Sequence, residues 1–138
     1  MHLELKETIG KYITILSRKS HLFLTKELLE NQCDILPGQI MFLMTLYNHG
    51  SVRQDNFHQL LHIDKGNSAK SLKNLEELGY ISRVRDEKDR RVYNVFPTEK
   101  ALELKPLIFS ILKKLDNSLG NNLSFQEYNQ LLTLLKKI

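Results

Sequence analysis

Two short segments of this chain carry side chains whose types and spacing suit contact with a polyanion. The first spans residues 64–79, and it is rich in lysines and small hydrogen-bonding groups, which donate to phosphates and to base edges. Beyond Asp64 its only carboxylates are Glu76 and Glu77, near the far end. A generic solvated helix, which is the alternative, more often mixes both signs along its length. The candidate contact residues are Lys65, Asn67, Ser68, Lys70, Ser71 and Asn74.

The second segment, residues 85–91, mixes cations with carboxylates. A loop that presents cations on a rigid hairpin can enter the narrow, electronegative minor groove of DNA. Asp86 and Asp89 are better suited to hold arginines by charge-assisted hydrogen bonds than to face phosphates. The alternative is an ordinary solvated turn. The candidate cations are Arg85, Lys88, Arg90 and Arg91, and Arg83 is expected to add phosphate affinity.

Other chemistry has weaker support in the sequence. His58 and His62 are four residues apart and Asp55 precedes them, so one helical face could hold all three beside a metal ion. This spacing arises easily by chance, a fourth ligand is missing, and the alternative is that these histidines lie near DNA and help with phosphates when protonated. Cys33 has few cationic neighbours in sequence, and we expect a partly buried filler rather than a reactive thiol. We therefore predict no metal site.

Composition bounds the class of protein. The chain has 138 residues, 41% of them hydrophobic and 26% charged, which suits one globular domain. A net charge of +4 and a sequence pI of about 9.2 permit a polyanionic partner. No apolar run is long enough for a membrane span and no signal peptide is evident, so we expect a cytoplasmic protein. No nucleophile motif, phosphate-binding loop or triad is present, which argues against an enzyme.

Helix punctuation and hydrophobic periodicity divide the chain clearly. Pro37 suits the first turn of a helix, Ser51 and Gln54 form an S-x-x-Q capping box, and Gly50 and Gly79 suit helix ends. Asp64, Thr98 and Ser124 are further expected N-caps. The predicted helices cover about residues 3–31, 37–49, 51–61, 64–78, 98–118 and 124–138, with strands at 80–85 and 91–96.

The resulting fold class is mainly α (α+β), in the order α-α-α-α-β-β-α-α. Three short helices followed by a hairpin make a winged helix-turn-helix, which is a DNA-binding architecture. On the fourth helix, Ala69, Leu72 and Leu75 are expected to pack inward, and Met41, Phe42 and Met44 of the second helix are assigned to the core.

The long first and last helices have apolar stripes that a core of this size cannot fully cover. A second copy of the chain is the simplest way to bury them. The residues assigned to this dimer interface are Leu5, Ile9, Ile108, Ile111, Leu115, Tyr128, Leu132 and Leu135.

The residues from Leu60 through Leu104 resemble the MarR family of bacterial and archaeal transcription regulators. The most specific match is the loop Asp86-Glu87-Lys88-Asp89-Arg90-Arg91, which has the family's D-x-[RK]-D-x-R pattern. It follows residues 75–81, LEELGYI, which match the signature LExxGxI, and Leu36-Pro37-x-Gln39 also fits. One departure is PTEKA at residues 97–101, where the family commonly has L-T-x-x-G.

This resemblance implies a homodimer that binds pseudo-palindromic duplex DNA, with the fourth helix in the major groove and the wing in the minor groove. It also implies a repressor that a small molecule, metal or oxidant releases; no cofactor is expected. In a single domain, residues 1–34 and 99–138 would dimerise and residues 35–98 would bind DNA. The alternative is a winged-helix module that has lost DNA binding and contacts proteins, but such a module should lack the cations of the fourth helix and wing.

Overall fold

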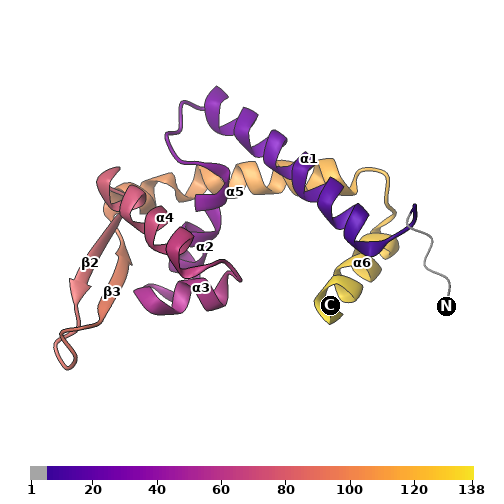
Figure 1. The fold of residues 1–138 in the computed structure, drawn as a ribbon. Coiled ribbons are helices and arrows are strands. Elements are labelled where there is room, and N and C mark those ends of the chain that lie inside the picture. The colour runs from indigo at the N-terminus through magenta and orange to yellow at the C-terminus, as the bar shows by residue number, and fades with distance from the viewer. Residues whose placement is uncertain (1–5) are drawn as a thin grey trace.

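The computed structural model describes residues 6–138, which form two regions joined by one long helix (Figure 1). We call residues 35–98 the lobe, and the first helix, the last helix and the end of the long helix the arm. The elements are α1 (Ile9–Glu30), η1 (Pro37–Gln39), α2 (Ile40–His49), β1 (Val52–Arg53), η2 (Gln54–Asn56), α3 (Phe57–Leu60), α4 (Lys65–Glu77), β2 (Ile81–Arg85), β3 (Tyr93–Pro97), α5 (Glu99–Gly120) and α6 (Phe125–Lys137).

Short-range caps set most helix ends where the sequence predicts them. The Asp64 carboxylate accepts the Asn67 N–H, and the Thr98 hydroxyl accepts the Ala101 N–H. Ser124 forms a complete capping box with the residue three positions later. Gly50 and Gly79 end α2 and the α4 segment with φ of +76° and +86°, a region that glycine adopts without steric cost.

The sheet has three antiparallel strands in the order β1-β3-β2, one more than the predicted hairpin. Val52 pairs with Val95, and Arg53 pairs with Asn94. The expected capping box at Ser51 is wrong: η2 has Arg53 at its N-cap and no side-chain cap bond. The backbone there is extended because it pairs with β3, a partner more than 40 residues away that local sequence does not reveal.

The core lies where the lobe meets α1 and α5. Phe42 and Phe57 stack with ring centroids 5.3 Å apart. Leu28 of α1 and Ile108 and Ile111 of α5 are at most 2% exposed and belong to this core. The assignment of Ile108 and Ile111 to the dimer interface is therefore wrong, because α5 packs into the core as far as Ile111.

The first turn of α2 lies differently from the expectation. Met41 is 55% exposed and does not belong to the core, whereas Phe42 is buried and Met44 is partly buried. An apolar run of this length cannot be buried on every side of a helix at the edge of the lobe, so one of its members faces outward.

The arm packs more loosely. Among the 22 residues of α1 only Leu28 is buried, and none of the 13 residues of α6 is. The arm is held by polar contacts as well: Lys114 Nζ lies 3.5 Å from Glu27 Oε2, and the Tyr128 hydroxyl donates to Asp116 Oδ2 at 2.7 Å. Leu5, assigned to the interface, lies outside the described residues.

Candidate nucleic-acid interface

Helix α4 presents lysines on one side and packs the other against the lobe. Leu72 and Leu75 are buried, as predicted, but the third inward residue is Ser68, which is 3% exposed, and Ala69 is exposed. Positions 68, 72 and 75 follow one helical stripe, so the inward side is turned by one residue from the expected one. The structure therefore contradicts the assignment of Ser68 to DNA contact. Lys65, Lys70 and Lys73 are exposed, and Ser71 is half-buried.

Asn67 lies at the start of α4 and is held by the residue that caps the helix. The two carboxylate oxygens of Asp64 accept its backbone N–H at 2.8 Å and its side-chain amide at 2.5 Å. This pair leaves the side-chain carbonyl oxygen of Asn67 facing away from the cap. The amide is thus pre-oriented at the end of the helix that helix-turn-helix proteins insert first.

Asn74 is tied to the interior of the lobe. Its side-chain oxygen accepts a hydrogen bond at 2.6 Å from the amide of Gln39, which is 3% exposed, and the Gln39 oxygen accepts the Leu36 N–H at 2.8 Å. The assignment of Asn74 to DNA contact overlooks this bond, which joins residues 35 positions apart. Gln39 is a structural residue that sequence reasoning noted only within the motif L-P-x-Q.

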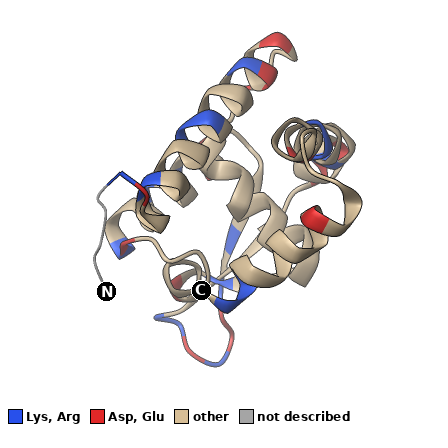
Figure 2. Cartoon of the chain, turned by 90° about the vertical axis from the view of Figure 1, so that its right-hand side faces the viewer, with Lys and Arg blue, Asp and Glu red and all other residues tan. Residues whose placement is uncertain are grey.

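The loop between β2 and β3, hereafter the wing loop, is shaped by two aspartates. Asp86 accepts the Asp89 N–H at 3.1 Å and the Asn94 amide at 3.2 Å, so it closes the turn rather than holding an arginine. Asp89 accepts both the N–H and the Nε of Arg91, at 3.1 and 3.3 Å. Figure 2 shows cationic and acidic residues together on this loop, at the bottom of the view.

The cations of the wing differ in whether they bond to other residues of the protein. Lys88 and Arg90 are exposed, and among residues 6–138 neither makes a side-chain hydrogen bond or ion pair. Arg91 is paired with Asp89, yet its side chain is 92% exposed. Arg85 donates from Nε to the Tyr93 hydroxyl at 3.0 Å. The wing loop therefore ends in two unrestrained cations supported by two partly fixed ones.

Arg83 does not serve as a free phosphate contact. Its guanidinium makes two hydrogen bonds to the Glu76 carboxylate of α4, at 3.0 and 3.3 Å, and a third to the Gln54 oxygen at 3.1 Å. The expectation that it adds phosphate affinity from the strand is therefore not supported. The pairing was missed because nothing in a linear pattern places β2 beside the end of α4.

The histidine pair is not arranged as the helical spacing suggests. α3 ends at Leu60, and His62 has φ of +53°, so His58 and His62 do not share one helical face. The residues described contain no cluster of three or more His, Cys, Asp or Glu side chains placed to hold a metal ion.

Cys33 is half-buried near two tyrosines. Burial, and next the neighbouring thiol of Cys33, raise the pKa of Tyr47 to about 12. Burial also raises the pKa of Tyr80, whose hydroxyl donates to Asp34 Oδ1 at 2.5 Å. These tyrosines therefore stay protonated near neutral pH and act as hydrogen-bond donors.

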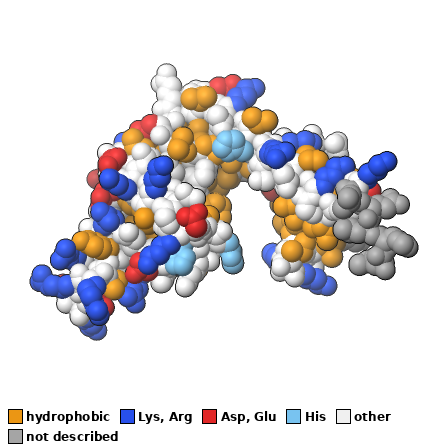
Figure 3. All heavy atoms as spheres, viewed as in Figure 1, with side chains coloured by type: hydrophobic (Ala, Val, Ile, Leu, Met, Phe, Trp, Pro, Cys, Tyr) orange, Lys and Arg blue, Asp and Glu red, His pale blue; other side chains and the backbone are white. Residues whose placement is uncertain are grey.

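The space-filling view separates a basic region from an apolar one (Figure 3). Basic side chains gather over the hairpin at lower left and beside α4, whereas hydrophobic side chains gather on the side of the arm that faces the lobe. An apolar pocket between α1, α5 and α6 is lined by Leu16, Leu119, Leu123, Leu131, Leu132 and Leu135, among others. Within residues 6–138, no helix combines the length and the hydropathy that crossing a membrane requires.

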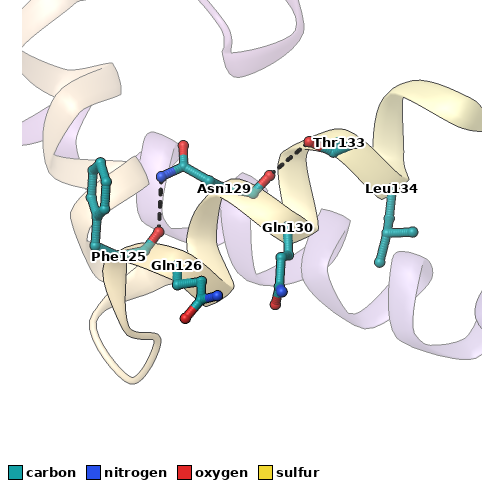
Figure 4. A pocket seen from close by; sticks show the side chains of 6 residues that line it. All are labelled: Phe125, Gln126, Asn129, Gln130, Thr133 and Leu134. Atoms are coloured by element: carbon teal, nitrogen blue, oxygen red, sulfur yellow. Dashed lines mark hydrogen bonds between the residues drawn. The ribbon is translucent and has the colours of Figure 1, made fainter.

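A second hollow runs along α6 and is lined by one helix only (Figure 4). Phe125 and Leu134 flank it, and its polar members are used locally: Asn129 donates to the Phe125 carbonyl at 2.9 Å, and Thr133 donates to the Asn129 carbonyl at 3.0 Å. Gln126 and Gln130 also line it, and neither side chain makes a hydrogen bond among residues 6–138, so this side of α6 presents exposed amides beside Phe125 and Leu134.

Known proteins share the sequence pattern and the fold of this chain. Residues 35–93 match the model of the MarR family. A MarR transcriptional regulator from Methanosarcina mazei is 34% identical, with a TM-score of 0.86 over 93% of this chain and 91% of that one. The uncharacterised HTH-type transcriptional regulator YybA of Bacillus subtilis is 29% identical over 75 residues, which are 54% of this chain and only 50% of YybA.

A mutant MarR from E. coli, solved in complex with operator DNA, gives a TM-score of 0.84 over 94% of this chain and 91% of that chain. It is 23% identical, so the likeness is one of fold. The relatives named here from M. mazei and B. subtilis are transcriptional regulators.

Proposed function

This chain belongs to the MarR family of transcriptional regulators, and we propose that it acts as a homodimer on pseudo-palindromic duplex DNA. In this proposal α4 enters the major groove and the wing loop enters the adjacent minor groove. The contact residues are Lys65, Asn67, Lys70, Ser71, Arg85, Lys88, Arg90 and Arg91. Residues 35–98 bind DNA, and the flanking helices join the two copies.

The observation that carries the proposal is the pair of cationic surfaces on one lobe. α4 exposes Lys70 and Lys73 on the side away from the core and Lys65 at its first residue, and the wing loop exposes Lys88 and Arg90. A helix and a hairpin tip are the shapes that fit a major and a minor groove. The fold shared with the E. coli protein that was solved with operator DNA supports this use of the lobe.

Dimerisation is supported by the arm, where large apolar side chains remain exposed. Ile9 is 68% exposed, Leu132 37% and Leu135 46%, and they lie on α1 and α6. Exposed apolar surface of this kind is typical of an interface. The interface we propose retains Ile9, Leu115, Tyr128, Leu132 and Leu135 from the predicted set. Two such subunits place half-sites about 10 base pairs apart, or one helical turn.

We further propose that the protein represses transcription and that an effector releases it. A dimer bound to a site that overlaps a promoter excludes the polymerase. A ligand lowers DNA affinity if it binds more tightly to a dimer whose two α4 helices are not spaced to fit successive major grooves. The family membership of the chain supports this regulatory mode.

The test is an in vitro selection of the purified protein on random duplex DNA, followed by a fluorescence anisotropy titration on the enriched sequence. We expect an inverted repeat, and an affinity that falls steeply with salt because phosphate contacts release counterions. Lack of enrichment by a folded dimer would favour the protein-interaction module instead.

The matched variants remove equal charge at two places. Lys88→Ala with Arg90→Ala should weaken binding by about a thousandfold or more, because each of the two wings of the dimer loses two minor-groove or phosphate contacts that contribute roughly 1–2 kcal/mol each. Lys136→Ala with Lys137→Ala, at the end of α6, should leave the affinity within about threefold. Equal losses in both pairs would show that only net charge matters and would remove the wing from the mechanism.

A further inference from the structure

We infer that Glu76, Arg83 and Tyr93 form a positioning network that sets the wing against α4, so that both reach DNA at once. This inference rests on the proposed function of the lobe. None of these three residues is a proposed DNA contact. Their role is to hold Arg85, which is one of the proposed DNA contacts.

The first link joins β2 to α4 and to the segment before α3. Arg83 donates from Nε to Glu76 Oε2 at 3.0 Å and from Nη2 to Glu76 Oε1 at 3.3 Å, which is a two-pronged pair. Its third bond, from Nη1 to Gln54 Oε1, measures 3.1 Å. A forked guanidinium fixes direction as well as distance, which a lysine ammonium cannot do. Three elements that frame the DNA-binding surface therefore meet on one side chain.

The second link runs from Arg83 to Arg85 through the Tyr93 ring of β3. The Arg83 guanidinium lies 5.1 Å from the ring centroid and the Arg85 guanidinium lies 5.5 Å from it. Arg85 also donates to the Tyr93 hydroxyl at 3.0 Å. Cation–π contact and hydrogen bond together orient Arg85 at the base of the wing loop. The position of α4 is thus coupled, through Arg83 and Tyr93, to Arg85, which is one of the proposed DNA contacts.

The sign of the Glu76 charge makes this network unusual for a DNA-binding surface. A carboxylate on a helix that faces DNA lowers the affinity for DNA by charge repulsion, unless a paired cation offsets its charge. The two side chains are only 30% and 36% exposed and meet through two parallel hydrogen bonds, which is the geometry in which an ion pair fixes direction. We therefore assign this carboxylate the role of orienting Arg83.

The experiment compares two single variants that remove the same negative charge from adjacent positions of α4. Glu77 is exposed and has no side-chain hydrogen bond or ion pair among residues 6–138, so Glu77→Gln should tighten DNA binding by about twofold through reduced repulsion. Glu76→Gln should instead weaken binding by about tenfold, or about 1.4 kcal/mol, because Arg85 loses its orientation. Tighter DNA binding in Glu77→Gln with weaker DNA binding in Glu76→Gln supports the network. Equally tighter binding in both variants overturns it.

Two further variants separate positioning from charge. Arg83→Lys keeps the cation but not the fork, so it should weaken binding about as much as Glu76→Gln does. An unchanged affinity would mean that Arg83 acts only as a charge. The exchange Glu76→Arg with Arg83→Glu keeps the pair and should recover part of the affinity that Arg83→Glu alone loses. The thermal midpoints of Glu76→Gln and Arg83→Lys should fall by no more than about 5 °C, so that the loss of affinity is not a loss of fold.

A measurement without DNA distinguishes this inference from the proposed function. In the free protein, NMR relaxation of the Arg83 Nε–H group should report a rigid side chain in the wild type and in Glu77→Gln, and a mobile one in Glu76→Gln. If the wild type binds no selected DNA but its Arg83 side chain is rigid, the proposed function is refuted while the contacts among Glu76, Arg83 and Tyr93 are supported. A mobile Arg83 in the wild type would overturn the network itself.

Discussion

The lobe and the arm use similar hydrophobic residues in opposite ways. In the lobe, α2 buries four of its ten residues, and Leu43 and Leu46 are fully enclosed. In the arm, α6 buries none of its thirteen residues, and Phe125 is 85% exposed. The lobe closes its core within one chain, with help from α1 and α5, whereas the arm keeps an apolar surface that one chain does not cover.

This difference indicates where stability and assembly reside. Loss of a buried lobe residue should act at any protein concentration, because the contacts lie within one chain. Loss of an arm residue should act through the second copy, so its effect should depend on concentration. Each of the following predictions tests one side of this contrast.

The largest expected effect is in the lobe core. Phe57 is fully buried and stacks on Phe42, so Phe57→Ala should lower the free energy of unfolding by about 3–5 kcal/mol through lost burial and a residual cavity. Urea denaturation at two protein concentrations measures it. Met41→Ala, at a residue that is 55% exposed in the same lobe, should cost less than about 1 kcal/mol. Similar losses at both positions would mean that the lobe core is not where the structure puts it.

The next effect is on assembly. Leu135→Glu puts a charge into the apolar surface of α6 and should raise the dimer dissociation constant about a hundredfold, or about 2.7 kcal/mol, because a carboxylate would be buried unpaired. Sedimentation equilibrium measures the change, and circular dichroism should show the lobe still folded. Gln126→Glu, which adds the same charge at an exposed polar position of α6, serves as the control. A monomeric wild type would remove the arm's proposed role.

A smaller effect should follow from the buried amide of the lobe. Gln39→Leu leaves the Leu36 N–H and the Asn74 side-chain oxygen without their partner, and should cost about 2 kcal/mol of stability. Thermal denaturation measures the loss. The exposed Gln59 offers the matched change, and Gln59→Leu should stay within about 0.5 kcal/mol of the wild type. A neutral Gln39→Leu would mean that water satisfies both groups.

The smallest effect should be local to the arm. Ser124→Ala removes the N-cap of α6 and should cost about 1 kcal/mol, seen as faster amide exchange in its first turn. Thr133→Ala, inside the same helix, should leave that turn unchanged.

The same capping box predicts a dependence on pH. Hydrogen bonds from the Ser124 backbone and then from its side chain hold the pKa of Glu127 below its usual value. Its contribution is therefore present above the ordinary glutamate pKa and is lost as pH falls through the lowered one. The protection factors of the amides in the first turn of α6, which compare each exchange rate with that of an unfolded peptide at the same pH, should fall over that acidic range in the wild type. The fall should be smaller in Glu127→Gln, and an equal fall would contradict the assignment.

Many helix starts in both regions were predictable because their signals are local. Asp64, Thr98 and Ser124 cap helices by bonding a backbone N–H three residues ahead, so a few adjacent residues carry the information. The charged turn between the two strands was predictable for the same reason, and Asp89 holds Arg91 as expected, but Asp86 bonds Asp89 and Asn94 rather than an arginine.

The errors came from contacts between distant elements. The inward side of α4 holds Ser68 rather than Ala69, because a polar residue small enough to pack there does not show in a hydrophobic pattern. Ile108 and Ile111 continue the same periodic stripe as the arm residues, yet they close the lobe because α5 crosses from one region to the other. Periodicity reveals that a side is buried and leaves open what covers it.

Most of the helices, the two long strands and the charged turn between them were therefore encoded in short runs of sequence, through steric and hydrogen-bonding rules that act over three or four residues, whereas β1 and the start of α3 were not. The folded chain alone decided that Gln39 meets Asn74, that Val52 pairs with Val95 and that Arg83 reaches Glu76. Those partners are 7 to 43 residues apart along the chain, and they meet only because burial of the shared core brings their elements together.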